Sequence, residues 1–248
     1  GCRSIDVPLY LQPDKLTKLH IMREEGEKLE HMSRLTNLEN LLISRATSET
    51  DQETLEPIMN LTKLTQLRLH CDFKTDNSSY MTNLTNLKSL ILRRDLTNLM
   101  TADAASKFSK LEELRFCEYF ADESFLTRIQ ALHQHTCYHT ILSNFKNLTR
   151  LQIHNQTPDL WQTLTKLSNL KALTIGWMDA KDMPALTTLT ALTDLDIGQF
   201  VMTDREIFAK LTNLQRLWLR YNDKREAHYF YSNLPYLHSF GWKRNQPL

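Results

Sequence analysis

The stretch "LTNLQRLWLRYND", residues 211–223, carries the spacing that decides the fold. Leucine stands at positions 211, 214, 217 and 219, so the apolar positions advance in steps of three and then by a step of two. An amphipathic helix needs spacings of three and four, and a half-buried strand needs strict alternation. The spacing therefore indicates a turn that leads into a short strand, with Leu217 and Leu219 on one side of that strand.

The same spacing recurs along the chain as the template L-x-x-L-x-x-L-x-L. Ten copies begin at positions 13, 35, 61, 84, 108, 145, 167, 189, 211 and 234. The second slot is leucine in every copy, and the last slot is always large and apolar, from Ile21 to Trp242. The third slot returns after 22 to 26 residues, apart from one step of 37. A period in this range with this pattern resembles the leucine-rich repeat, and the L-T-N-L opening resembles the short, 22-residue type of internalin-like and phosphatase-regulating members.

The resemblance implies an α/β leucine-rich-repeat solenoid of about ten repeats. It would have a parallel sheet on its concave face and short helices and loops on its convex face. One strand cannot bury its two leucines alone, so successive repeats must stack. We expect a single domain over residues 1–248, with an irregular insertion at about 117–144 in the 37-residue step. Capping boxes of Thr50 with Glu53 and Thr203 with Glu206 predict helix starts, and "DLWQTLTKL" and "MPALTTL" predict single helical turns.

The chain departs from the family at the asparagine that usually follows the last slot by three residues. That position holds asparagine in two copies, at Asn222 and Asn245, and aspartate in two others, at Asp72 and Asp95. Met178 and Phe200 fill it in two regular repeats. We therefore expect a less regular ladder of backbone bonds than the family usually has.

Composition excludes several functional classes. The chain has 248 residues and a net charge of +1, which gives no bulk attraction to nucleic acid or an anionic membrane. No apolar run approaches the ~18 residues of a membrane span. The four isolated cysteines favour a reducing, cytoplasmic compartment, with a secreted or cell-surface location as the alternative. The missing initial methionine and the absence of a polar terminal cap suggest a fragment of a longer protein.

No catalytic or cofactor motif is present: the phosphate-binding, nucleotide-binding, nucleophile-elbow and zinc-protease patterns are all missing. The pair Asp194 and Asp196 would lie on an open strand without the enclosure that tunes catalytic carboxylates. We expect a protein that is not an enzyme and has no cofactor.

The insertion contains the one cluster of metal-ligand side chains, His133, His135, Cys137 and His139 in "HQHTCYH". Zinc sites usually take ligands from two separated turns, so we favour a polar loop without metal over a zinc site. The preceding "DESFLTRIQALHQH" predicts an amphipathic helix that packs on the convex side, with a partner contact as the alternative.

Strand parity places a set of polar side chains on the concave face, where this architecture usually binds partners. The candidate partner-binding residues are Trp218, Arg216, Arg220, Asp194, Asp196, Arg68, Arg93, Arg115, Arg150 and His154. Trp218 is the most informative, because a large aromatic residue between two arginines has the composition of an interface hot spot. We expect its ring to stay largely in solvent.

The sequence therefore predicts a non-catalytic domain that binds a protein partner and not nucleic acid, and that acts as the binding arm of a larger protein. The alternatives are a secreted or surface adhesin or effector of internalin type, or a substrate-receptor or regulatory subunit of a ubiquitin ligase or phosphatase. The partner and the oligomeric state do not follow from the sequence.

The histidine cluster gives a first testable prediction. We expect the purified chain to contain no stoichiometric zinc and a chelator to leave its melting temperature unchanged, because a structural metal would couple to folding. Elemental analysis and a thermal melt with and without EDTA measure both. One zinc per chain would contradict the prediction.

Overall fold

The computed structural model describes residues 13–23, 29–45, 56–70, 80–92, 102–116, 138–153, 160–200, 205–219 and 227–241. The chain divides into two compact units. Unit 1 comprises Gly1–Glu118 and Thr140–Asn147, and unit 2 comprises Tyr119–His139 and Leu148–Leu248.

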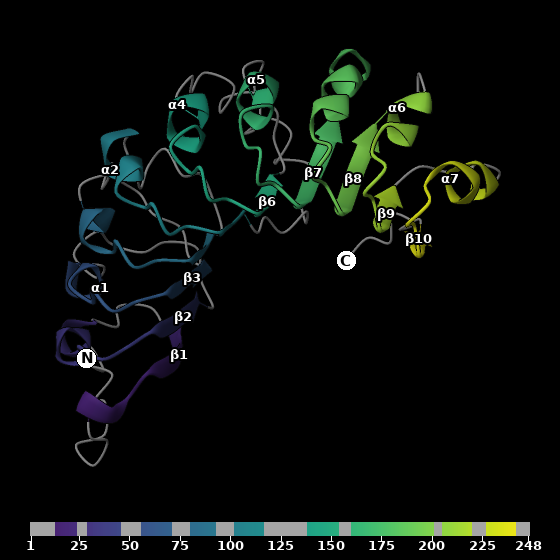
Figure 1. Ribbon diagram of the computed structural model, residues 1–248. Coiled ribbons are helices and arrows are strands. Elements are labelled where there is room, and N and C mark those ends of the chain that lie inside the picture. Colours follow the sequence, from purple (N-terminus) through teal and green to yellow (C-terminus); the bar gives the residue numbers. More distant parts are fainter. Residues whose placement is uncertain are drawn as a thin grey trace. The chain divides into compact units, whose positions relative to one another are not determined.

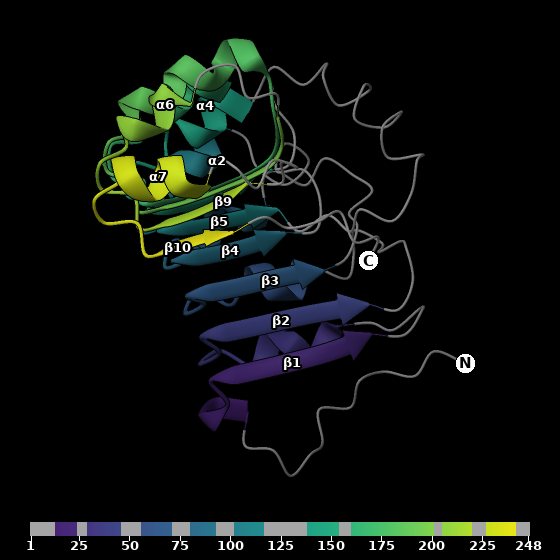
Figure 2. The same cartoon turned by 90° about the vertical axis from the view of Figure 1, so that its right-hand side faces the viewer.

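Unit 1 contains five parallel strands that pair in chain order, which Figure 2 shows side by side. They are β1 (Lys18–Arg23), β2 (Asn40–Arg45), β3 (Gln66–His70), β4 (Ser89–Leu92) and β5 (Glu113–Phe116). Short helices return the chain along one face of this sheet (Figure 1): η1 (Pro13–Lys15), η2 (Glu30–Arg34), α1 (Glu56–Met59), η4 (Tyr80–Asn83) and α2 (Ala102–Ser106). Helix α4 (Tyr138–Leu142) follows before the next strand.

Unit 2 repeats this plan with β6 (Arg150–Ile153), β7 (Ala172–Met178), β8 (Asp194–Phe200), β9 (Arg216–Leu219) and β10 (Ser239–Gly241). Its helices are α5 (Leu160–Leu164), η5 (Ala180–Thr188), α6 (Glu206–Ala209) and α7 (Ala227–Asn233). Figure 1 shows α5, η5 and α6 on one face of the sheet. In both units we call the sheet face away from the helices the outward face.

The leucine template forms the core of each unit, as the sequence predicts. The second-slot leucines from Leu38 to Leu214 are 0 or 1% exposed, and the strand leucines beside them are equally buried. Burial weakens at the two ends of the described chain, where Leu237 is 8% exposed and Leu16 is half-buried. A repeat at the end of a stack has a neighbour on one side only, so this difference follows from nearest-neighbour packing.

A regular backbone pattern joins successive repeats at the start of the strands. One carbonyl there accepts hydrogen bonds from two consecutive N–H groups of the next repeat. In unit 1 Thr65 O accepts from Lys88 N at 2.8 Å and from Ser89 N at 3.0 Å. In unit 2 Thr193 O accepts from Gln215 N at 2.8 Å and from Arg216 N at 2.9 Å. The start of the described strands is therefore regular. Most of the positions that follow the last slot by three residues, on which the expected irregularity depends, lie outside the described residues.

Asparagine recurs at a different position of the repeat, the third residue of the L-T-N-L segment. The side-chain amides of Asn37, Asn86, Asn147 and Asn213 donate to backbone carbonyls of the preceding repeat, at distances of 2.6 to 2.9 Å. Lysines in alternate repeats extend this chain: Lys63 donates to Asn37 Oδ1 and Lys110 donates to Asn86 Oδ1. Meanwhile Met178 occupies the family's usual asparagine position in β7 and is 1% exposed. Asparagine amides therefore bond to the preceding repeat at the turn before the strand. At the position of the family's usual asparagine in β7, the buried side chain of Met178 stands instead.

The helical predictions are confirmed in part. Helix α5 lies within "DLWQTLTKL", whereas "MPALTTL" falls in η5, a 3₁₀ segment with Pro184 inside it. Helix α6 begins at Glu206 after Arg205, which makes no side-chain cap. Thr203, the Thr50–Glu53 box and the helix expected at residues 122–135 lie outside the described residues.

The buried leucine slots give a stability prediction. Leu170 is 1% exposed, so Leu170→Ala should lower the free energy of unfolding by roughly 2–5 kcal/mol through lost transfer energy and a cavity. Urea denaturation followed by circular dichroism measures this. Lys171→Ala, at an exposed neighbouring side chain, is the matched control and should change little. A loss below about 1 kcal/mol for Leu170→Ala would show that the site relaxes around the cavity.

Candidate functional site

The outward face of unit 2 brings most of its candidate residues into two rows that cross the strands. The first row is Arg150, Ala172, Asp194, Arg216 and Ser239, in strand order. The second row is Gln152, Thr174, Asp196, Trp218 and Gly241. Each strand holds its row members two residues apart, because the residue between them points to the other face: a buried leucine on β6 to β9 and the half-buried Phe240 on β10. We call Asp194, Asp196, Arg216 and Trp218 the Trp218 cluster.

The carboxylate of Asp194 organises the first row of this cluster. Arg216 Nε donates to Asp194 Oδ1 across the strand boundary, and the Thr193 hydroxyl donates to Asp194 Oδ2 at 2.7 Å. The hydrogen bond that Arg216 donates to Asp194, together with the charge of that carboxylate, raises the pKa of the Arg216 guanidinium above its ordinary value. The arginine side chain is 53% exposed, so the pair orients a solvent-facing cation.

The prediction that the Trp218 ring stays largely in solvent is wrong, because the residue is half-buried. Its neighbour in the register is Gly241 on β10, and the ring lies over the backbone of that glycine. A Cβ on Gly241 would come within 2.1 Å of Trp218 Cζ3 and 2.5 Å of Cε3. One part of the indole is therefore buried against β10, and the residue is half-buried as a whole. The ring is on the outward face, as parity requires, but it is held against the sheet.

Sequence parity misses a second aromatic residue of this sheet, Trp177. Alternation from Leu173 and Ile175 would turn Trp177 into the core, yet Trp177 is 44% exposed and Met178 is buried. The signal in the sequence is Gly176, which recurs 22 residues later as Gly198 in a chain with five glycines. Glycine inside a strand often marks a close approach of another backbone, and the alternation of faces breaks here between Ile175 and Met178.

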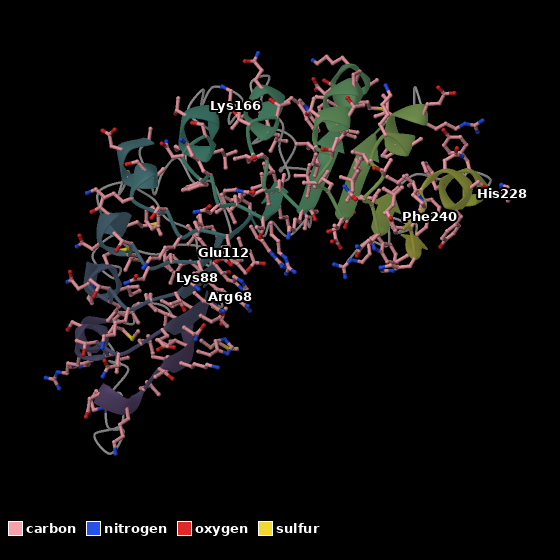
Figure 3. All side chains as sticks on the ribbon, in the orientation of Figure 1. Arg68, Lys88, Glu112, Lys166, His228 and Phe240 are labelled. Carbon is pink, nitrogen blue, oxygen red and sulfur yellow. The ribbon has the colours of Figure 1, made fainter. Side chains whose placement is uncertain are left out.

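The outward face of unit 1 has a different composition. Its middle row is His20, Leu42, Arg68, Ile91 and Arg115. Arg68 is exposed and projects away from the helices (Figure 3), while Arg115 donates to Glu113 at 2.5 Å. Glu113 also accepts a hydrogen bond of 2.6 Å from the buried Ser89 hydroxyl. The register thus aligns the two arginines in one row, two strands apart.

Three candidate residues, Arg93, His154 and Arg220, lie outside the described residues. The same holds for His133, His135 and Cys137, and the side chain of His139 is not described either. Over the described ranges, no group of three or more His, Cys, Asp or Glu side chains could hold a metal ion. The described helices also include none long and apolar enough to cross a membrane.

Comparison with known proteins places the fold. No protein-family model and no curated protein matches the chain. Among solved structures, an internalin (InlF) of Listeria monocytogenes is 23% identical with a TM-score of 0.60, over 94% of this chain and 62% of the internalin. Internalin C2 of the same organism gives 23% identity and a TM-score of 0.48 over 93% and 82% of the two chains. A leucine-rich-repeat protein of Leptospira interrogans gives 16% and 0.42 over 91% and 72%.

The match to InlF, together with the parallel sheets and buried leucine slots, shows that the chain has the leucine-rich-repeat fold. The chain spans 62% of the length of that internalin.

The contact between Trp218 and Gly241 gives a prediction about this surface. Gly241→Ala should displace the indole and lower the free energy of unfolding by about 1–3 kcal/mol, because the new methyl group overlaps the ring. Urea titration measures the loss, and the shift in indole emission, taken as a difference against Trp218→Phe, reports the displaced ring.

Ser239→Ala is the control, since Ser239 lies on the same strand and outward face but in the first row. The overlap would be refuted by a Gly241→Ala variant with wild-type stability and emission.

Proposed function

We propose that this leucine-rich-repeat chain is a non-catalytic recognition domain that binds a protein partner on the outward face of unit 2. Trp218 is the anchor of the interface. The observation that carries the proposal is an indole held against Gly241 on the outward face, beside an arginine fixed by a carboxylate.

Preorganisation supports this role for the cluster. Binding costs free energy whenever rotamer-rich side chains must be ordered, by about 0.5–1.5 kcal/mol for each side chain. The Asp194 carboxylate already orients Arg216, and the Gly241 backbone already supports the Trp218 ring. Much of that ordering cost is therefore met during folding. Tryptophan and arginine are also among the residue types most enriched in interface hot spots.

The chemistry of the cluster favours a protein over other ligands. Two carboxylates, one guanidinium and an indole lie on two adjacent strands, β8 and β9, so charges of both signs are present. Nucleic acid would need a continuous basic stripe. Catalysis would need enclosed groups with perturbed acidity, whereas these strands present an open face. A cytoplasmic location remains a prediction from the isolated cysteines.

Differential capture tests the proposed function. Immobilised wild-type chain and Trp218→Ala are exposed to the same lysate of the source cells, and bound proteins are quantified by mass spectrometry. A protein retained by the wild type and lost from Trp218→Ala is then purified, and its dissociation constant is measured. Trp218→Ala should weaken binding by about 2 kcal/mol or more, as hot-spot truncations do.

The control separates lost binding from lost folding. Trp218→Ala removes the packing on Gly241, so we expect it to cost stability, by about 1–2 kcal/mol and not the negligible amount of a surface change. Circular dichroism must show that the variant is folded at the assay temperature. A folded Trp218→Ala chain that retains every partner of the wild type would refute the proposed site.

A further inference from the structure

Arg68 on β3 is a candidate residue that the proposed function does not use. The outward face of unit 1 has a first row beside its middle row, and this first row is Lys18, Asn40, Gln66, Ser89 and Glu113. Arg68 is the central member of the middle row, and its exposed side chain projects away from the helices (Figure 3). The residues around this position therefore decide what its guanidinium group can bind.

No carboxylate of the described residues neutralises Arg68. Arg115 is paired with Glu113, and Arg216 with Asp194, but Arg68 has no such partner in the described part of the chain. The described positions around it on the outward face are all without acidic side chains: Leu42, Ile91, Gln66, His70, Asn40, Ser44 and Ser89. The guanidinium is thus available to an anionic group of another molecule.

Glu113 is the one carboxylate of the first and middle rows, and its charge is already used. It lies two strands from Arg68, where it accepts a hydrogen bond of 2.6 Å from Ser89 and pairs with Arg115 at 2.5 Å. Lys18, Arg68 and Arg115 are the cations of the same two rows, so positive charge is in excess. This part of the face attracts an anion.

Two aliphatic side chains stand beside Arg68 in its row. Leu42 on β2 and Ile91 on β4 are its register partners, although outward positions of a sheet are usually polar. Ile91 is 6% exposed, whereas Leu42 is half-buried and keeps some surface that a partner can cover. A hydrogen bond to a charged group is stronger in less polar surroundings. Arg68 therefore combines an unneutralised guanidinium with apolar neighbours.

The charge of the site favours a carboxylate over a phosphate. The planar guanidinium presents parallel N–H donors that match either group. A phosphate monoester carries nearly two negative charges near pH 7, and Glu113 would repel the second of them. Nucleic acid would need a continuous basic stripe, whereas Leu42 and Ile91 interrupt the row. One unpaired arginine beside leucine matches an acidic side chain with an apolar residue near it.

We propose that the outward face of unit 1 binds an acidic segment of a protein, in which an aspartate or glutamate pairs with Arg68 and an adjacent apolar side chain packs on Leu42. The surface belongs to unit 1, so the proposal goes beyond the Trp218 site of unit 2 and does not rest on it.

Selection from a random library of 12-residue peptides displayed on phage tests the proposal. The bait is the full-length Trp218→Ala chain, in which the proposed site of unit 2 is disabled. The double variant Arg68→Gln/Trp218→Ala removes background binders. Enriched peptides should share an aspartate or glutamate with an apolar residue near it.

A synthetic peptide from the enriched set then tests direct pairing by isothermal titration calorimetry. Arg68→Gln should weaken its binding at least about tenfold, the size of a hydrogen bond between charged groups. Changing the peptide's acidic residue to its amide should give a similar loss. The two changes together should cost little more than either alone, because both remove the same contact.

Further variants separate charge, geometry and packing. Arg68→Lys keeps the charge but not the planar donor group, so its affinity should fall between those of wild type and Arg68→Gln. Leu42→Thr should weaken the peptide by about threefold or more through lost apolar contact. Arg34→Gln is the matched control, because Arg34 is an exposed arginine of unit 1 at the end of η2, and its affinity should stay within twofold of wild type. Circular dichroism must show that each variant is folded.

Several results would overturn the proposal. They are a failure to enrich any peptide over the double variant, enrichment without an acidic residue, and losses for Arg68→Gln and the peptide amide that multiply independently. A phosphoserine peptide that binds more tightly than its glutamate counterpart would overturn the choice of a carboxylate. Because the bait already lacks Trp218, each of these results leaves the proposed site of unit 2 untouched.

Discussion

The structure depends on the packing of one repeat's leucines against those of the next. A strand of three to seven residues cannot bury its inward apolar side chains within its own repeat. The short helix of each repeat is also below the length that is stable alone in water. Stacking resolves both problems, since each repeat provides the apolar surface against which its neighbour packs. The two N–H groups bonded to one carbonyl at each strand start, and the turn amides such as Asn86, fix the offset between neighbours. Side-chain packing and backbone bonds thus impose the same register.

Because the leucine packing and the backbone bonds set this register, the side chains of the outward face are not needed to define the fold. These side chains contribute little to the leucine core, so they can vary in type while the sheet stays the same. The two units show this freedom, since unit 1 places Arg68 and Arg115 in its middle row and unit 2 places Asp196 and Trp218 in the equivalent row. Binding chemistry can therefore be distributed over the face without a change of fold, which is why the repeat architecture indicates recognition but not a particular partner.

Sequence reasoning recovers the features that depend on one strand and its period. The leucine slots, the parallel order and the outward position of Asp194, Arg216 and Trp218 follow from spacing alone, and the structure confirms them. The errors concern features that depend on what the neighbouring strand carries at the same level. The covered face of Trp218 depends on the absence of a side chain at Gly241, and the exposure of Trp177 depends on the close approach of Gly176 to Gly198. A periodicity argument treats each strand separately, so it has no means to detect either contact.

Glycine is the residue through which folding and recognition become coupled in unit 2. Three of the five glycines in the chain stand on its strands, and at two of them, Gly198 and Gly241, a side chain would collide with a neighbour. Glycine weakens a strand interior, by roughly 0.5–1 kcal/mol relative to alanine in regular structure. The fold tolerates that cost because the packing between neighbouring repeats also stabilises each strand. In return, the missing side chain at Gly241 lets the Trp218 indole rest on the backbone of β10, and Gly198 lets the Gly176 carbonyl approach closely beside the exposed Trp177. The stacking of the repeats therefore permits the aromatic surface of Trp177 on β7 and Trp218 on β9, which neither strand could support alone.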